Sequence, residues 1–103
     1  MIFKRRFADV VSRQLDLYAA EHADLLEDVE LFLKAYSDSP RAEAEERYGD
    51  YVDRVDLAAE ALADIRNTYA RTLDEDAADE YEAAFERAAA KRFPRLASAL
   101  GEL

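Results

Sequence analysis

Apolar residues recur at steps of three and four along most of the chain, which is the period of an amphipathic α-helix. Three successive stripes have this spacing. The first comprises Phe7, Val11, Leu15, Tyr18, His22, Leu25, Val29, Phe32, Leu33 and Tyr36; the second comprises Ala44, Tyr48, Tyr51, Val55, Ala58, Leu62, Ile65 and Tyr69; the third comprises Ala78, Tyr81, Phe85, Ala88, Arg92 and Leu96. The pattern predicts an all-α protein with three helices.

Two breaks separate the predicted helices. At the first break, Ser39 can cap a new helix and Pro40 fits its first turn. At the second, either Thr72 or Asp74 can cap the next helix. We therefore expect helices over residues 3–36, 40–72 and 75–93 and a short helical tail after Pro94, within a single helical domain of residues 1–103. The short links predict an up-down-up antiparallel bundle with a long hairpin between its first two helices.

The distribution of charge is consistent with this topology. The chain has 24 acidic and 14 basic residues and a formal charge of -10. An up-down-up bundle would place the basic start, Lys4, Arg5 and Arg6, beside the acids between Asp74 and Glu80. It would also bring Lys91, Arg92 and Arg95 level with Glu21, Asp24, Asp53 and Asp56. Exposed ion pairs contribute only about 0 to 1 kcal/mol each, so they select the register more than they stabilise the fold.

Composition narrows the possible functions. Two glycines and two prolines are too few for the turns of a small β or α/β domain. The absence of cysteine excludes disulfides, thiolate zinc sites and thiol nucleophiles. The acidic charge disfavours nucleic acid as a partner, and no apolar window approaches the roughly 18 residues of a membrane span. We expect a cytoplasmic protein with no cofactor and no stable membrane insertion.

Two pairs of acids form the most specific motif in the chain. Glu27 and Glu30 are followed by Asp53 and Asp56, with three-residue spacing within each pair. The motif is similar to the E-x-x-E and E-x-x-D pairs of the all-α nucleoside triphosphate pyrophosphohydrolases of the MazG type, except that Asp53 replaces a glutamate. The resemblance implies four carboxylates that bind magnesium and activate water for attack on a phosphate. This activity is one alternative function.

The single histidine and the six tyrosines have packing roles in our interpretation. His22 lies on the apolar stripe between Tyr18 and Leu25, and no nucleophile, base and orienting group can be assembled around it. We therefore expect His22 to be half-buried and hydrogen-bonded to a neighbour. All six tyrosines fall on inward faces of the predicted helices, which favours core packing over stacking on nucleobases.

A mismatch in helix length leads to the main functional hypothesis. The third predicted helix is too short to cover the whole hairpin, and the uncovered end carries Leu31, Phe32, Leu33, Tyr36, Tyr48 and Tyr51. Such a patch is unusual on a soluble monomer. We expect a homodimer in which two hairpins complete a four-helix core. The sequence thus predicts a small helical interaction protein without catalytic activity. A second alternative is an adaptor or antitoxin-like module whose patch binds another protein.

Overall fold

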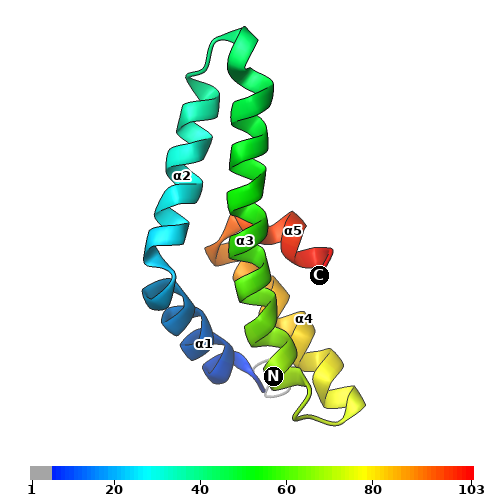
Figure 1. The fold of residues 1–103 in the computed structure, drawn as a ribbon. Coiled ribbons are helices and arrows are strands. Elements are labelled where there is room, and N and C mark those ends of the chain that lie inside the picture. The colour runs from blue at the N-terminus through cyan, green and yellow to red at the C-terminus, as the bar shows by residue number, and fades with distance from the viewer. Residues whose placement is uncertain (1–5) are drawn as a thin grey trace.

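The computed structural model describes residues 6–103 as an elongated, all-helical protein measuring 52 × 23 × 23 Å (Figure 1). The predicted all-α class is confirmed. The described residues form five α-helices and no strand. They are α1 (Ala8–Glu21), α2 (Ala23–Ser37), α3 (Ala44–Ala70), α4 (Glu75–Arg92) and α5 (Ala97–Gly101), with 3₁₀ turns at Arg41–Glu43 and Pro94–Leu96.

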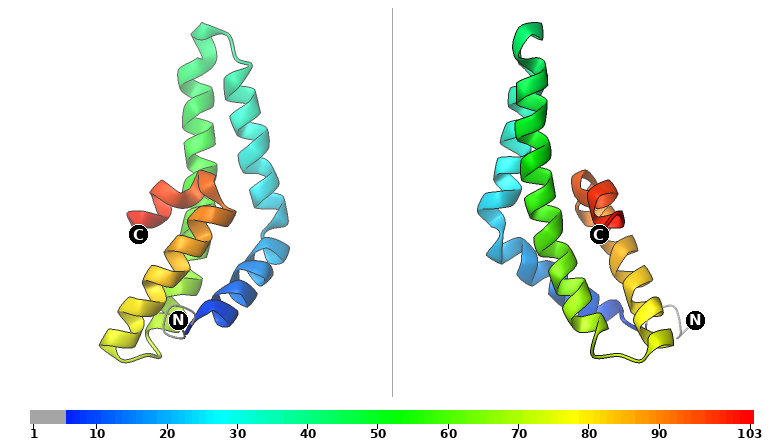
Figure 2. Two further views of the ribbon diagram at one scale, coloured as in Figure 1. Left: turned by 180° about the vertical axis from the view of Figure 1, so that it is seen from behind. Right: turned by 45° about the vertical axis from the view of Figure 1, so that its right-hand side comes forward.

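The helices lie around α3, which is the longest. The views in Figures 1 and 2 show α1 and α2 following one another toward one end, where α3 begins its return beside α2. Helix α4 then turns back along the second half of α3, and α5 crosses near the middle of α3. Helix α2 packs along α3, while α1 packs against α4.

The prediction of one continuous helix over residues 3–36 is wrong. Residues 3–5 lie outside the described part, and the rest divides at His22, whose backbone leaves the helical region with φ -117° and ψ 27°. Neither proline nor glycine lies nearby to signal the break. The apolar stripe is continuous, but its first half packs on α4 and its second half on α3. Tertiary packing therefore accounts for the change of direction.

The link between α2 and α3 also differs from the prediction. The Ser39 hydroxyl donates to the Tyr36 carbonyl at 2.7 Å, so it closes the end of α2 and does not cap a new helix. Pro40 precedes the 3₁₀ turn at Arg41–Glu43, and α3 begins at Ala44 instead of residue 40. Gly49 lies within α3 without interrupting it.

The second link and the tail agree with the sequence-based expectation. Asp74 is the N-cap of α4 and accepts a hydrogen bond from the Ala77 N–H at 2.9 Å, which selects one of the two predicted caps. Helix α4 covers Glu75–Arg92, close to the predicted residues 75–93. The tail after Phe93 is helical, as predicted.

The core joins α1, α3, α4 and the tail, and α2 contributes Val29 to it. Its largest fully buried side chains are Tyr18, Tyr81, Phe85, Leu62, Leu96, Leu100 and Val29. The hydroxyl of Tyr18 donates to the Ala58 carbonyl at 2.7 Å, and the hydroxyl of Tyr81 donates to the side-chain oxygen of Gln14 at 2.6 Å. Burying a tyrosine is favourable because the hydroxyl finds such a partner while the ring excludes water.

Ion pairs at the two ends of α4 show how the break in the first helix changes the register. Arg6 lies 3.6 Å from Glu80, in agreement with the predicted basic start beside these acids; Lys4 and Arg5 lie outside the described residues. Arg92 pairs with Asp16, and Arg95 pairs with Glu30, so the predicted acids Glu21, Asp24, Asp53 and Asp56 are not their partners. The C-terminal end of α4 therefore contacts α1, and the 3₁₀ turn at Pro94–Leu96 contacts α2.

The two buried tyrosines predict a loss of stability in alkali. Burial raises the pKa of Tyr18 to about 12 and that of Tyr81 to about 12, from an ordinary value of 10.0. Between these values the unfolded chain has lost the phenolic protons and the folded chain has kept them, so stability falls as pH rises. We expect the free energy of unfolding to fall by roughly 2 kcal/mol per ring from neutral pH to pH 12.

Urea unfolding across this pH range tests the prediction. Tyr18→Phe should be less stable at neutral pH, because it lacks the bond to Ala58, but should show a shallower alkaline decline. Tyr48→Phe alters a ring that is 50% exposed and serves as the control. If the free energy of unfolding of Tyr18→Phe fell with pH as steeply as that of the wild type, the raised pKa of Tyr18 would not be a source of the alkaline loss of stability.

Candidate functional site

The most distinctive surface is the far end of the α2/α3 hairpin. We call residues 30–54 the hairpin end; they include the last turns of α2, the link and the first turns of α3. No side chain in this range is buried, whereas Val29 and seven residues of α3 from Val55 onward are. Only α2 and α3 lie at this end in Figures 1 and 2. Apart from Glu30, which contacts Arg95, and Tyr51, which packs against the core, the residues of each helix therefore have the other helix as their neighbour here.

Five of the six predicted patch residues share one face of the hairpin end. Phe32, Leu33, Tyr36 and Tyr51 are half-buried along the seam between α2 and α3, and Tyr48 is 50% exposed beside them. Leu31 is the exception. It lies two positions from buried Val29, which is about 200° around the helix, and it is 54% exposed on the outer side of α2.

One aromatic contact crosses this seam from α2 to α3, and a second lies within α3. The ring centroids of Tyr36 and Tyr48 are 5.1 Å apart, and those of Tyr48 and Tyr51 are 6.2 Å apart. The expectation that all six tyrosines face inward is wrong for Tyr48, half of whose surface is open. The reason is its position beyond α4 and the tail, where no third element covers α3.

Arg54 contributes a positive charge to the same surface. Its guanidinium carbon lies 4.9 Å from the centroid of the Phe32 ring, within the range of a cation–π contact. Its Nε is buried without a hydrogen-bond partner among the described residues. A buried donor without an acceptor is unfavourable, and the ring face compensates in part. Arg54 also forms no ion pair within residues 6–103, so its terminal amines have no anionic partner there.

The short reach of α4 and the path of the tail leave the hairpin end uncovered. Helix α4 has 18 residues and α3 has 27, which correspond to about 27 Å and about 40 Å of helix. Pro94 then lacks the N–H needed to continue α4, and the chain turns across α3. Leu96 and Leu100 are each 1% exposed, so the apolar side chains of the tail are used in the core near the middle of α3.

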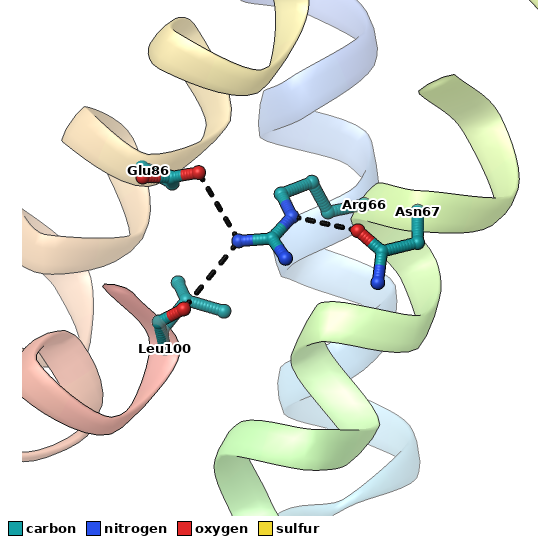
Figure 3. Close-up of polar contacts among 4 residues, drawn as sticks. All are labelled: Arg66, Asn67, Glu86 and Leu100. Carbon is teal, nitrogen blue, oxygen red and sulfur yellow. Dashed lines mark hydrogen bonds and ion pairs between the residues drawn. The ribbon is translucent and has the colours of Figure 1, made fainter. Parts of the chain in front are cut away.

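Arg66 anchors the tail in this position (Figure 3). Its side chain is almost fully buried; one terminal amine lies 3.1 Å from a Glu86 oxygen on α4 and 3.5 Å from the Leu100 carbonyl on α5. Its Nε donates to the Asn67 side chain at 3.0 Å. Arg66 is not part of the predicted apolar stripe, but it lies four residues after Leu62, and a cation one turn from a core leucine needs buried acceptors.

A second contact ties the tail to α2 at the border of the hairpin end. Two guanidinium nitrogens of Arg95 donate to the two carboxylate oxygens of Glu30, at 3.1 and 3.3 Å. The hydrogen bond and charge of Glu30 raise the pKa of Arg95 further above its usual value. Both side chains are exposed, so solvent screening weakens the pair. Its main consequence is positional, because beyond Glu30 the tail no longer covers α2.

The structure does not assemble the four acids of the pyrophosphohydrolase-like motif. Glu27, Glu30, Asp53 and Asp56 are all exposed, and Glu30 is engaged by Arg95. Within residues 6–103, no three His, Asp or Glu side chains lie close enough together to hold a metal ion. The carboxylate cluster implied by the resemblance is therefore not formed.

His22 lies at the junction of α1 and α2, and its contacts match the expected packing role. Its ring stacks on Tyr18 with centroids 4.8 Å apart, and its Nδ1 lies 3.3 Å from the Tyr18 carbonyl. The side chain is half-buried. These contacts fill the inner side of the bend between the two helices.

Comparisons of the chain with protein-family models, with curated proteins and with solved structures found no match. Among the helices of residues 6–103, none has both the length and the apolar character required to cross a membrane.

The anchoring role of Arg66 can be tested by two substitutions. Arg66→Ala removes the buried stem together with its bonds and should lower the free energy of unfolding by about 2 to 4 kcal/mol. Arg66→Met keeps the apolar stem, and Glu86, whose side chain is 44% exposed, can regain water. The methionine variant should therefore change stability by less than about 1 kcal/mol in urea unfolding. Equal destabilisation by both variants would show that the charge, and not the stem, holds the tail.

Proposed function

We propose that this chain is a small helical interaction protein without a catalytic role, and that its hairpin end pairs with a second copy to form a homodimer. One observation carries the proposal. Residues 30–54 contain no buried side chain, although they present Phe32, Leu33, Tyr36, Tyr48 and Tyr51 along one seam. A helix pair with an apolar seam and no third neighbour buries only part of each side chain, and the remaining area favours association.

Symmetry explains why a second copy is a suitable partner. Two helices cannot enclose a core, but two hairpins related by a two-fold axis can form a four-helix arrangement. In such a dimer the same face is used twice, so one apolar seam is sufficient. The surface is also rich in tyrosine and includes Arg54, which are residue types that dominate the binding energy of interfaces.

Charge modifies this association in a predictable way. Two copies with a formal charge of -10 each repel one another at long range. Added salt screens that repulsion, so the dimer should become tighter as ionic strength rises.

An adaptor or antitoxin-like function would use the same surface with a different protein in place of the second copy. The oligomeric state of the isolated chain separates the two functions. In a homodimer the second copy covers the hairpin end, whereas in an adaptor the hairpin end stays open until a different protein binds.

The self-association prediction uses two substitutions on α3. Tyr48→Asp places a charge on the seam and should raise the dissociation constant of the dimer at least about 100-fold, because each copy contributes one altered ring. Leu57→Asp is the matched control. Leu57 is 48% exposed, against 50% for Tyr48, and its position nine residues further along places it on the opposite side of α3.

Sedimentation equilibrium over a concentration series measures both dissociation constants, and circular dichroism verifies that each variant is folded. Tyr48 is a better site than Phe32, whose ring also packs beneath Arg54. A wild type that stays monomeric at high concentration would reject the homodimer and favour the adaptor. Equal effects of the two substitutions would place the interface elsewhere.

A further inference from the structure

A groove between α1 and α4 forms a second surface, distant from the hairpin end. The two helices pack against one another at the opposite end of the molecule, as Figure 2 shows. The groove has a volume of about 1010 Å³. Its floor contains Val11 and Leu15, and the small side chains of Ser12, Ala84 and Ala88 line it. Short side chains leave room for another backbone to approach closely.

The α4 side of this groove carries three cations. Arg87, Lys91 and Arg92 all line it. Arg92 is already paired with Asp16 and lies over the Phe93 ring, but Arg87 and Lys91 form no ion pair with any residue between 6 and 103. Their positions differ by four residues, so they lie one turn apart along the groove. A chain with an excess of acids thus presents two unpaired cations beside an apolar floor.

We propose that this groove binds an amphipathic helix of another protein, with its apolar stripe in the groove and acidic side chains paired with Arg87 and Lys91. Recognition of this kind uses residues at steps of three and four on the bound helix. Acids one turn apart on such a helix would match the spacing of about 5.4 Å between successive turns of α4. The small groove-lining side chains allow the two helices to approach closely.

The geometry favours a helix over a lipid. The groove is more open than enclosed, whereas sites for small apolar ligands enclose most of the ligand surface. Its two unpaired cations are also spread along α4, which suits a row of acids more than a single anionic headgroup.

The geometry also favours another protein over a second copy of this chain. Leu17, Leu31 and Leu57 are the exposed leucines of the described helices. Each is flanked at three and four positions only by polar residues or alanine, so none belongs to a second apolar stripe that could enter the groove.

A display library of helical peptides tests this proposal. The peptides share an apolar stripe, and their flanking positions vary among Glu, Gln and Lys. Selection on the wild-type protein should enrich Glu at flanking positions one turn apart. The double variant Arg87→Glu/Lys91→Glu should bind the selected peptides at least about tenfold more weakly in fluorescence anisotropy.

Two controls separate the groove from the overall charge. Arg13→Glu/Arg71→Glu makes the same change in net charge at exposed positions that do not line the groove, and it should leave affinity within about twofold. Ser12→Trp fills the groove from an exposed position and should abolish binding, whereas Ser12→Ala should not. Circular dichroism confirms that each variant is folded.

Four outcomes would overturn the proposal. The first is selection without enrichment of Glu, and the second is unchanged binding to Ser12→Trp. The third is loss of self-association in Arg87→Glu/Lys91→Glu, which would make a second copy the occupant. The fourth is binding to phosphatidylglycerol vesicles that is lost in the same variant, without peptide binding, which would assign the groove to lipid. Because the hairpin end lies elsewhere, failure of this proposal and failure of the homodimer are distinguishable.

Discussion

The buried side chain of Arg66, whose apolar stem we expect to contribute more than its charge, lies where the tail meets α3 and α4. By contacting Glu86 on α4 and the Leu100 carbonyl on α5, it fixes the tail across the middle of α3. The apolar side chains of the tail then complete the core at that level and go no further toward the hairpin end. A tail extended along α2 and α3 would have covered the seam. The position of one buried cation is therefore linked to the exposure of the surface proposed for self-association.

The residues that stabilise the fold and the residues proposed for association therefore lie at opposite ends of the molecule. At the end opposite the hairpin end, the buried rings and the hydroxyls of Tyr18 and Tyr81 join α1, α3 and α4 in one core. At the hairpin end, α2 and α3 pack mainly on one another, and their apolar side chains remain half-buried or exposed because no third helix covers them. The groove between α1 and α4 arises from a different cause, since small residues line it and leave a channel. The hairpin end is thus exposed because a third helix is missing there, and the groove is open because its lining side chains are short.

Much of the fold could be predicted from local signals, and the remainder depended on tertiary contacts. The bounds of α4 and the Asp74 cap were predictable because capping chemistry and helical period act within a few residues. The break at His22 was not, because no local residue favours it and the helices on either side pack on different partners. The outward direction of Leu31 was available from the helical period alone. The anchoring contacts of Arg66 depend on the direction in which the tail turns after Pro94. No local pattern in the sequence specifies that direction.

The central claim, that two hairpin ends meet across a two-fold axis, can be tested by measuring distances between copies with spin labels. The chain contains no cysteine, so a label at Gly49→Cys would be unique, and a side chain there meets no atom within 4 Å. Asp79→Cys provides the comparison; it is an exposed position in the second turn of α4, the helix that begins at the other end of the molecule in Figure 1. Pulsed electron paramagnetic resonance should give a clearly shorter separation between copies for Gly49→Cys than for Asp79→Cys. No dipolar coupling at Gly49→Cys at concentrations where the protein sediments as a dimer, or a shorter distance at Asp79→Cys, would contradict the account.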